Sequence, residues 1–542
     1  MKYALLLVTA LTCCAQAPDP SEPGPLPVTN TQYRFDSVQI PQIPYSVDIW
    51  ATVWHPADLS GGPYPLLVFQ HGNHGICRQV GTTSDFATSL TPPLCPAGFT
   101  QTPNHLGYDY IASRLAGYGY IVVSVNANAI NTRPNGNPER GRLIQEHLRY
   151  WTIWNSADGG FPFGKTFSGK VNLRNIGLMG HSRGGEGVRA AYNFNRQEGS
   201  PFGIRALLEI GPVDFGRLNS TTPNPVFNVD GVPFAVILPA CDGDVSDNQG
   251  MRVYDRARYI PETSPAPKTQ LYVYAANHNF YNSQWTPEDS LFRCIDFPIL
   301  TQRPPQEQIG LVYVMGFFRN YIGGEDFRSL FTGDVAPPES VGVPIAQSYQ
   351  ESPNEIQLID DFSARQSPDV NVAGGANLTA NLAIKTCSSN TCNDPPPGAW
   401  FNDPATTVAK ISWPQDSKDT PTLTMRLKAG GTSLDISKMA ILAFRVAAQH
   451  SPLNPVLAAS QNFSVRLVDS TGKTSASVAA ADRRPIPYPT GYGYRRSMLR
   501  TMRFTLESFK GVDLADIVAV QFVFDKQPQG AIFLTDVHLS PR

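Results

Sequence analysis

The sequence predicts an α/β fold followed by a domain of antiparallel β-strands, and three observations support this prediction. Short apolar runs alternate with helical patterns up to Tyr321, as in a mostly parallel sheet flanked by helices. A glycine-flanked serine, Ser182, stands between one such run and a helical segment. From Ile359 onward, short alternating runs replace the helical period. The length of 542 residues also exceeds what one hydrophobic core supports, so we expect two folded domains.

The N-terminal residues predict export. A basic residue precedes the apolar run Ala4 to Leu11, which is too short to span a membrane but suits a signal peptide. We therefore expect a signal peptide over residues 1–17 and a secreted or cell-surface protein. A poor lipoprotein box leaves a lipid anchor at Cys13 or Cys14 as the alternative. Residues 18–32, rich in proline and acidic side chains, predict an extended linker.

The first folded domain, expected over residues 33–325, contains several runs typical of strands. Val47 to Trp54 alternates between apolar and polar residues, as in a half-buried antiparallel strand. Tyr64 to Gln70 is apolar almost throughout, as in a strand covered on both faces. Further buried strands are predicted at 120–125, 176–179, 206–210, 232–238 and 270–274, and helices at 108–117 and 141–155.

The composition changes after this domain. Residues 326–352 are punctuated by glycine and proline and predict a linker. Residues 353–542 then show short alternating strands at regular spacing, which is typical of an antiparallel β-sandwich. The expected strands are 422–427, 440–446, 463–468, 501–506, 518–524 and 532–539.

Composition and motifs exclude several classes of ligand. Lys and Arg number 43 against 45 Asp and Glu, which gives no electrostatic argument for nucleic acid. The chain has no glycine-rich phosphate loop and no dinucleotide fingerprint, so we expect no cofactor. His71 and His74 lack further ligands at a metal-binding spacing, so we also expect no metal site.

The segment Gly180-His181-Ser182-Arg183-Gly184 matches the turn that presents a nucleophilic serine between a strand and a helix. A serine hydroxyl needs a base to remove its proton, and that base needs an orienting carboxylate. In this arrangement the acid and then the histidine follow the serine on loops after late strands. The loop after Leu238 offers Asp242, Asp244 and Asp247, and the loop after Tyr274 offers His278. The rival bases are His71, His74 and His147.

Two motifs carry a resemblance to known enzymes. Gly180 to Gly185 resembles the nucleophile turn of the α/β-hydrolase branch that contains chlorophyllases, dienelactone hydrolases and platelet-activating-factor acetylhydrolases. Ala240-Cys241-Asp242-Gly243-Asp244 resembles the acid loop of cutinase-type polyester hydrolases, whose catalytic Asp matches Asp244. The resemblance covers residues 33 to 321 and implies an α/β-hydrolase fold. It also implies cleavage of carboxylic esters through an acyl-enzyme on Ser182, with His278 as base and Asp244 as acid.

The fold also implies an oxyanion hole built from two backbone N–H groups. One belongs to Arg183, the residue after the nucleophile, and the other to Asn73, which follows His71-Gly72. The Arg183 side chain is expected to form an ion pair with Glu186 or another carboxylate, with substrate binding as the alternative.

Export makes disulfides the expected state of the remaining cysteines. We expect the pairs Cys77–Cys95, Cys241–Cys294 and Cys387–Cys392, with free buried thiols as the alternative. The cutinase-type polyester hydrolases that this chain resembles also have a cysteine at the position of Cys241, bridged to the histidine loop.

The expected partner is an ester substrate, and polymeric and lipidic esters are both left open. A secreted serine peptidase is the alternative enzyme, because the same three side chains cleave amides. An adhesive protein with a non-catalytic hydrolase scaffold is the alternative outside enzymes. The C-terminal domain resembles galactose-binding-like β-sandwiches, which implies contact with a carbohydrate or surface polymer through that domain.

Overall fold

The fold was analysed on a computed structural model of the chain. It describes residues 16–82, 95–131, 133, 136–218, 225–257, 266–290, 302–363, 368–388, 406–415, 419–454, 460–488 and 497–541. Within these ranges no helix is both long and apolar enough to span a membrane.

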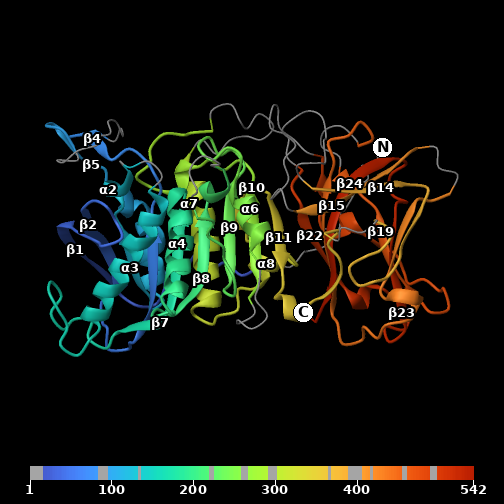
Figure 1. Ribbon diagram of the computed structural model, residues 1–542, viewed down its shortest axis with the longest axis horizontal. Coiled ribbons are helices and arrows are strands. Elements are labelled where there is room, and N and C mark those ends of the chain that lie inside the picture. Colours follow the sequence, from blue (N-terminus) through green and yellow to red (C-terminus); the bar gives the residue numbers. More distant parts are fainter. Residues whose placement is uncertain are drawn as a thin grey trace, which may run out of the picture.

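A nine-stranded sheet forms the centre of the first domain, on the left of Figure 1. Its strand order is β1-β2-β6-β3-β7-β8-β9-β10-β11. The six strands from β6 to β10 in this order run parallel, whereas β1, β2 and β11 join antiparallel. The strands are Val28–Val38 (β1), Val47–Pro56 (β2), Tyr64–Gln70 (β3), Ile121–Val125 (β6), Val171–His181 (β7), Ile204–Ile210 (β8), Phe234–Pro239 (β9), Lys268–Val273 (β10) and Ile345–Gln350 (β11).

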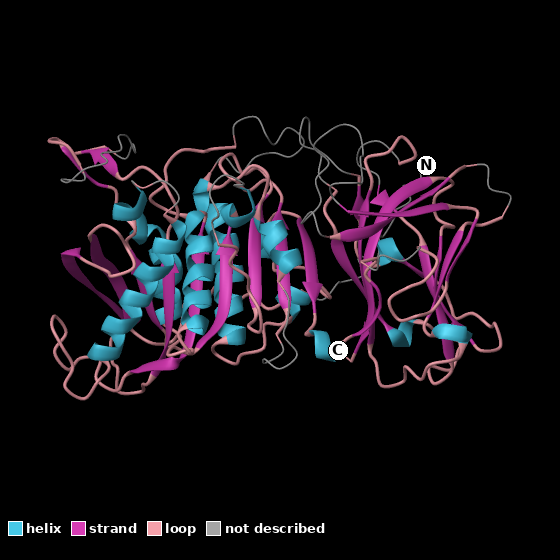
Figure 2. Cartoon of the chain, in the orientation of Figure 1, coloured by secondary structure: helices cyan, strands magenta, loops and turns pink. Residues whose placement is uncertain are grey.

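Helices cover both faces of this sheet (Figure 2). Alternate side chains of β3 show the two layers, because Leu66 and Val68 belong to one apolar cluster and Leu67 and Phe69 to the other. The first cluster includes residues of α3 (Asn137–Trp154), α4 (Arg183–Gln197) and α6 (Gly250–Arg256). The second includes residues of α1 (Asp109–Ala116), α7 (Arg303–Tyr321) and α8 (Ser329–Thr332). Two further short helices are α2 (Asn128–Asn131) and α5 (Phe215–Leu218).

The second domain is an antiparallel β domain, on the right of Figure 1. One sheet has the order β14-β15-β24-β17-β22, with β12 also paired to β24, and the other has the order β13-β16-β23-β19-β20. Large apolar side chains such as Trp413, Phe444 and Phe522 fill a common core. The strands are Gln357–Asp360 (β12), Asn377–Ala380 (β13), Ala383–Ser388 (β14), Thr407–Trp413 (β15), Thr422–Arg426 (β16), Ile441–Ala448 (β17), Ser464–Asp469 (β19), Val478–Ala479 (β20), Arg500–Thr505 (β22), Ile517–Val523 (β23) and Gly530–Ser540 (β24). The predicted fold class, an α/β-hydrolase fold followed by an antiparallel β domain, is confirmed.

Two pairs of short strands lie outside these sheets. They are Cys77–Gln79 (β4) with Phe99–Gln101 (β5), and Ser460–Gln461 (β18) with Ile486–Pro487 (β21).

Both predicted linkers are wrong where the structure describes them. The segment expected to link the domains, residues 326–352, contains β11, which extends the main sheet beside β10. The segment expected to be an extended linker, residues 18–32, lies against the first domain, where Arg319 donates a hydrogen bond to the Pro20 carbonyl (2.9 Å) and β1 begins at Val28. The predicted signal peptide falls almost wholly outside the described residues, but Ala17 is already buried against the helical layer.

The two domains meet along the edges of their sheets, β11 and β22. The Ser348 hydroxyl donates to the carbonyl of Leu499 (2.8 Å), and Thr501 Oγ1 accepts a hydrogen bond from the N–H of Tyr349 (2.9 Å). Figure 1 shows β11 at the border, facing the β domain. This contact covers two strand edges that would otherwise be exposed.

Candidate active site

Ser182 lies in a sharp turn between β7 and α4. Its backbone has φ 57° and ψ −125°, a conformation that costs a non-glycine residue of order 1–3 kcal/mol. The Ser182 N–H donates to the carbonyl of Ile210 at the end of β8 (2.9 Å), which fixes the turn against the sheet.

The glycines around Ser182 are required by close backbone contact. A Cβ atom on Gly180 would overlap the Gly184 carbonyl, and one on Gly184 would overlap the Gln70 carbonyl of β3. A Cβ atom on Gly72 would overlap the side chain of Ser182 itself. The turn after β3, to which the predicted oxyanion donor Asn73 belongs, therefore lies directly against the serine.

A buried histidine–aspartate pair lies beside this turn. Nδ1 of His278 is 2.8 Å from Oδ2 of Asp242, and both side chains are 1 % exposed. Gly211, the residue after Ile210, packs on this pair, since a Cβ atom there would lie 3.0 Å from His278 Nδ1 and 3.1 Å from Asp242 Oδ2. The His278 ring therefore lies next to the strand end that holds Ser182.

The expectation that Asp244 orients His278 is wrong in this geometry. Asp244 lies on the opposite edge of the ring, with Oδ2 3.6 Å from Nε2, and its side chain is 61 % exposed. Asp242 instead faces inward because its Oδ1 accepts the N–H groups of Asp244 (3.0 Å) and Val245 (2.6 Å). This turn points the first aspartate of the loop at the histidine and the second toward solvent. Asp247, the third candidate, pairs with Arg252 (2.9 Å).

The electrostatic surroundings favour the protonated form of His278. Burial alone would lower its pKa, but Asp242, Asp244 and Asp289 together raise it to about 9. Nε2 of His278 is buried and carries no hydrogen bond within the described part of the chain. It is the ring nitrogen left to exchange a proton.

Asp289 joins the two loops that carry this pair. Its Oδ2 accepts the N–H of Gly243 (3.1 Å), and its Oδ1 accepts the N–H of Asn279 (3.0 Å). One carboxylate thus holds the residue after Asp242 and the residue after His278. Burial raises the pKa of Asp289 to about 6, although His278 and the two N–H groups act in the opposite direction. No sequence motif distinguished Asp289 from other surface acids.

The predicted oxyanion donors keep their N–H groups unused. In the described ranges, neither the N–H of Asn73 nor that of Arg183 donates a hydrogen bond. Arg183 is the first residue of α4, where backbone N–H groups have no partner within the helix. The predicted ion pair between Arg183 and Glu186 is not formed, because the Glu186 oxygens accept from Asn137 (2.5 Å) and Gly216 (3.2 Å).

The rival histidines occupy structural positions. His71 is held by the backbone at both ring nitrogens, with Nδ1 2.8 Å from the Gly72 carbonyl and Nε2 accepting the N–H of Ala127 (2.8 Å). His147 lies in the core, 2.6 Å from the Tyr33 hydroxyl. His74 stacks on the buried Trp285, with ring centroids 4.7 Å apart, and burial lowers its pKa to about 4.

Trp285 connects the site to the loop that follows β3. Its indole N–H donates to Asn104 Oδ1 (2.8 Å), and its ring lies 6.1 Å from the His278 ring in a nearly parallel orientation. Trp285 was not among the candidate residues predicted from the sequence. A lone tryptophan after the histidine loop gives no pattern that could have marked it.

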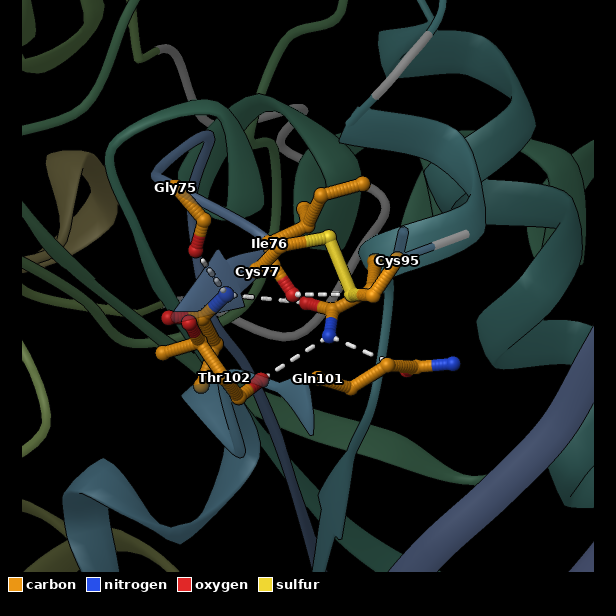
Figure 3. Close-up of a disulfide and its surroundings, with 8 residues drawn as sticks. Gly75, Ile76, Cys77, Cys95, Gln101 and Thr102 are labelled. Carbon is orange, nitrogen blue, oxygen red and sulfur yellow. Dashed lines mark hydrogen bonds between the residues drawn. A yellow bond between two sulfur atoms is a disulfide. The ribbon is translucent and has the colours of Figure 1, made fainter. Parts of the chain in front are cut away.

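The loop between residues 76 and 104 is closed by the predicted Cys77–Cys95 disulfide (Figure 3). Asn104 donates to the Gly75 carbonyl (3.1 Å), which anchors the end of the loop beside its start. Cys241 and Cys387 are also disulfide-bonded. Their predicted partners, Cys294 and Cys392, lie outside the described residues, so these two pairings stay predictions.

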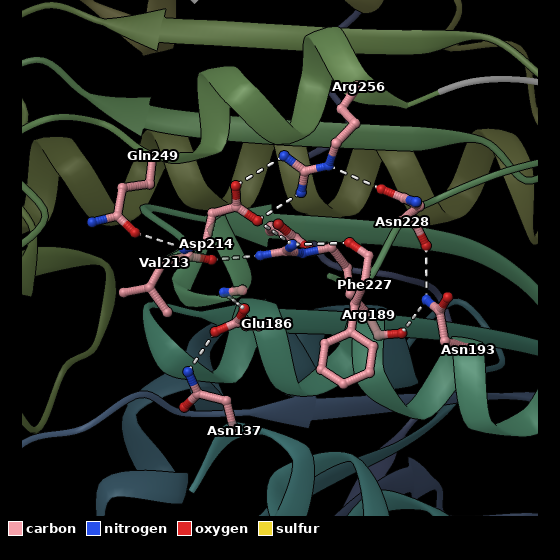
Figure 4. Close-up of polar contacts among 12 residues, drawn as sticks. Asn137, Glu186, Arg189, Asn193, Val213, Asp214, Phe227, Asn228, Gln249 and Arg256 are labelled. Atoms are coloured by element: carbon pink, nitrogen blue, oxygen red, sulfur yellow. Dashed lines mark hydrogen bonds and ion pairs between the residues drawn. The ribbon is translucent and has the colours of Figure 1, made fainter. Parts of the chain in front are cut away.

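A buried ionic network around Arg189 and Asp214 involves α4, the helix that follows the serine turn (Figure 4). Arg189 of α4 binds Glu209 (2.7 Å) and Asp214 (3.1 Å), and Arg256 of α6 also binds Asp214 (2.6 Å). Burial would raise the pKa of Asp214, but the two guanidinium groups outweigh it and lower that pKa. Because Asp214 follows Gly211 by three residues, the network fixes the loop that packs on the His278–Asp242 pair.

No cluster of three or more metal-binding side chains occurs among the residues that the structure describes.

Comparison with known proteins gives one distant relative and no family. The chain is 26 % identical to a bis(hydroxyethyl) terephthalate hydrolase of Streptomyces coelicolor over 271 residues, which is 48 % of this chain and 74 % of the relative. No family model matches the chain. The similarity suggests an esterase-like hydrolase.

Proposed function

We propose that the protein is a serine hydrolase of carboxylic esters in which Ser182, His278 and Asp242 act together. The observation that carries this proposal is the buried hydrogen bond between His278 and Asp242, beside a strained serine turn. Buried charge pairs and strained backbone both cluster at catalytic sites, which supports a catalyst over a non-catalytic scaffold.

In the proposed reaction, Nε2 of His278 takes the hydroxyl proton of Ser182 while Oγ attacks the ester carbonyl carbon. The negative oxygen that forms accepts hydrogen bonds from the N–H groups of Asn73 and Arg183. Collapse of this intermediate breaks the bond to the alcohol, which takes the proton from Nε2 and leaves an acyl group on Ser182. Water then repeats the sequence, releasing the carboxylic acid and restoring the serine. Asp242 keeps the ring oriented and stabilises its protonated form.

The distant relative supports esters of an aromatic acid with a short alcohol as the substrate class, because its name specifies bis(hydroxyethyl) terephthalate. We propose a soluble ester of this kind as the first substrate to test, and polymer films second.

Three variants test the proposal by the hydrolysis of bis(hydroxyethyl) terephthalate. Ser182→Ala should lower kcat by roughly five orders of magnitude, and Asp242→Asn by roughly four, because the amide favours the wrong tautomer of His278. Asp244→Asn should lower kcat by less than about tenfold, since Asp244 does not touch Nδ1. Near-native turnover by Ser182→Ala would overturn the proposal. A larger loss for Asp244→Asn than for Asp242→Asn would reassign the acid.

Labelling of the intact protein with a fluorophosphonate separates a catalyst from an adhesive scaffold. An activated serine should be labelled in the wild type and not in Ser182→Ala. A matched pair of ester and amide substrates with one acyl group then separates an esterase from a peptidase.

We also propose that the protein acts outside the cytoplasm, on a cell surface or after secretion. The disulfide between Cys77 and Cys95 supports this location, because such bonds persist in oxidising compartments. Binding of a carbohydrate or surface polymer by the β domain remains a separate prediction, which a pull-down of the intact protein on insoluble polysaccharides would test.

A further inference from the structure

Asp244 is a charged group beside the reacting atoms that the proposed mechanism does not use. Its Oδ2 lies 3.6 Å from Nε2 of His278, the nitrogen that passes a proton to the departing alcohol in the proposed reaction. The carboxylate of Asp242 is buried on the other edge of the same ring. The two acids of one loop therefore face opposite edges of the histidine.

The Asp244 carboxylate is free to receive a ligand. Its side chain is 61 % exposed, and in the described part of the chain its oxygens accept no hydrogen bond and lie within ion-pair distance of His278 alone. Its backbone is fixed, because its N–H donates to Asp242 Oδ1 (3.0 Å). The backbone that carries this carboxylate is thus tied to the proposed catalytic acid.

The charges nearby show which part of the site Asp244 faces. Asp244 contributes to the raised pKa of His278, and it opposes the lowering of the pKa of His74 and of Arg183 that burial causes. His74 belongs to the turn after β3 and Arg183 begins α4. Asp244 therefore lies on the Nε2 side of the His278 ring, and in the proposed reaction the alcohol takes its proton from this nitrogen as it leaves.

We infer that Asp244 forms a leaving-group subsite, whose carboxylate accepts a hydrogen bond from a hydroxyl group carried by the alcohol part of the ester. The favoured substrates are then esters of diols and other polyols, with the free hydroxyl close to the ester oxygen. Alcohols that carry a negative charge are disfavoured, because their charge would lie next to the carboxylate. The inference rests on the proposed ester hydrolysis and specifies the alcohol that the site selects.

Three benzoate esters of similar size test this inference by the ratio of their kcat/KM values. 2-Hydroxyethyl benzoate and propyl benzoate differ by a hydroxyl in place of a methyl group, and 2-carboxyethyl benzoate adds a negative charge. For the wild type we expect the hydroxyethyl ester to exceed the propyl ester by roughly three- to tenfold, as one hydrogen bond to a partly exposed charge allows. The carboxyethyl ester should fall below the propyl ester by roughly fivefold.

Two variants separate hydrogen bonding from charge. Asp244→Ala should bring the hydroxyethyl-to-propyl ratio to within about twofold of one. Asp244→Asn should keep part of that ratio through its amide oxygen but remove the penalty on the carboxyethyl ester. Asp247→Asn is the matched control, because it changes the same charge on the same loop, where the carboxylate pairs with Arg252. The control should leave all three ratios unchanged.

The outcomes separate a failure of the proposed ester hydrolysis from a failure of the subsite at Asp244. If the wild type hydrolyses none of the esters, or Ser182→Ala hydrolyses them normally, the proposed function itself is wrong. If the wild type hydrolyses them without preference, or with ratios that Asp244→Ala and Asp244→Asn leave in place, only the subsite at Asp244 is wrong.

Discussion

The buried ion pair between the domains gives a stability prediction that can be worked out from the structure. Arg445 of β17 binds Asp255 of α6 (2.9 Å), and the two side chains are 4 % and 3 % exposed. Arg445 also binds Asp536 (3.2 Å) and donates to the Ser348 hydroxyl (3.2 Å). Replacing Arg445 by methionine keeps most of the apolar stem but leaves a buried carboxylate without this guanidinium.

We expect Arg445→Met to lower the free energy of unfolding by about 3–5 kcal/mol, the usual cost of removing one partner of a buried pair. Burial raises the pKa of Asp255, and the positive charge of Arg445 only partly offsets this increase. Without Arg445 that pKa should rise further. An acid with a raised pKa in the folded state makes the fold less stable as pH increases. The loss in Arg445→Met should therefore be larger at pH 8 than at pH 5.

Urea unfolding, followed by tryptophan fluorescence and by ester hydrolysis, measures this effect in the full chain. The double variant Arg445→Met/Asp255→Asn should lose less than the sum of the two single variants, because it removes both charges. Arg466→Met is the control, since Arg466 donates to Gln521 within the second sheet of the β domain (2.6 Å). The assigned role of this pair would be refuted if the losses in unfolding free energy of the two single variants simply added up in the double variant. A loss below about 1 kcal/mol for Arg445→Met would also refute it.

Three further predictions concern the boundary, pH and loop geometry. A chain ending at Gly333 lacks β11 and exposes the edge of β10, so it should be insoluble when expressed. Soluble, active protein would contradict the assigned sheet order. Because the proposed base must be neutral, kcat/KM should rise with pH up to the raised pKa of His278, about 9, and Asp244→Asn should move this rise to lower pH. A rise centred near the ordinary histidine pKa in both proteins would contradict this reasoning. Asp289→Ala should lower kcat by roughly ten- to a hundredfold, because the two loops lose their shared acceptor; the neighbouring Glu288→Ala is its control, and equal effects of the two would refute the specific role.

Much of the fold could be predicted because buried parallel strands are continuous apolar runs. The predicted run Tyr64 to Gln70 coincides with β3, and both faces of that strand are covered. β11 could not be found this way, because its sequence contains Gln347 and Ser348. Both side chains are buried: Ser348 donates to the carbonyl of Leu499 in the other domain, and Gln347 donates to the carbonyl of Leu330 in α8. When distant segments supply the hydrogen-bond partners of a strand's polar side chains, the sequence of the strand itself shows no apolar pattern.

Within the candidate site, the spacing of strands and loops indicated Ser182 and His278 as candidates but could not choose between Asp242 and Asp244. The two acids are separated by one glycine, so any argument from the order of elements applies to both. The choice depends on which carboxylate closes the turn on the N–H groups of residues 244 and 245. That is a three-dimensional property of the loop.

The helix α6 connects the loop of the proposed acid to both domains. It follows the loop of Asp242 and Asp244 and ends with two adjacent charged residues. Arg256 binds Asp214 in the buried ionic network around Arg189 and Asp214, while Asp255 binds Arg445 of the β domain. The loop that carries the proposed acid is therefore held from both sides, by the first domain through Arg256 and by the second through Asp255. Since a displacement of about 1 Å in a catalytic group can cost a hundredfold in rate, loss of the β domain should reduce catalysis as well as stability.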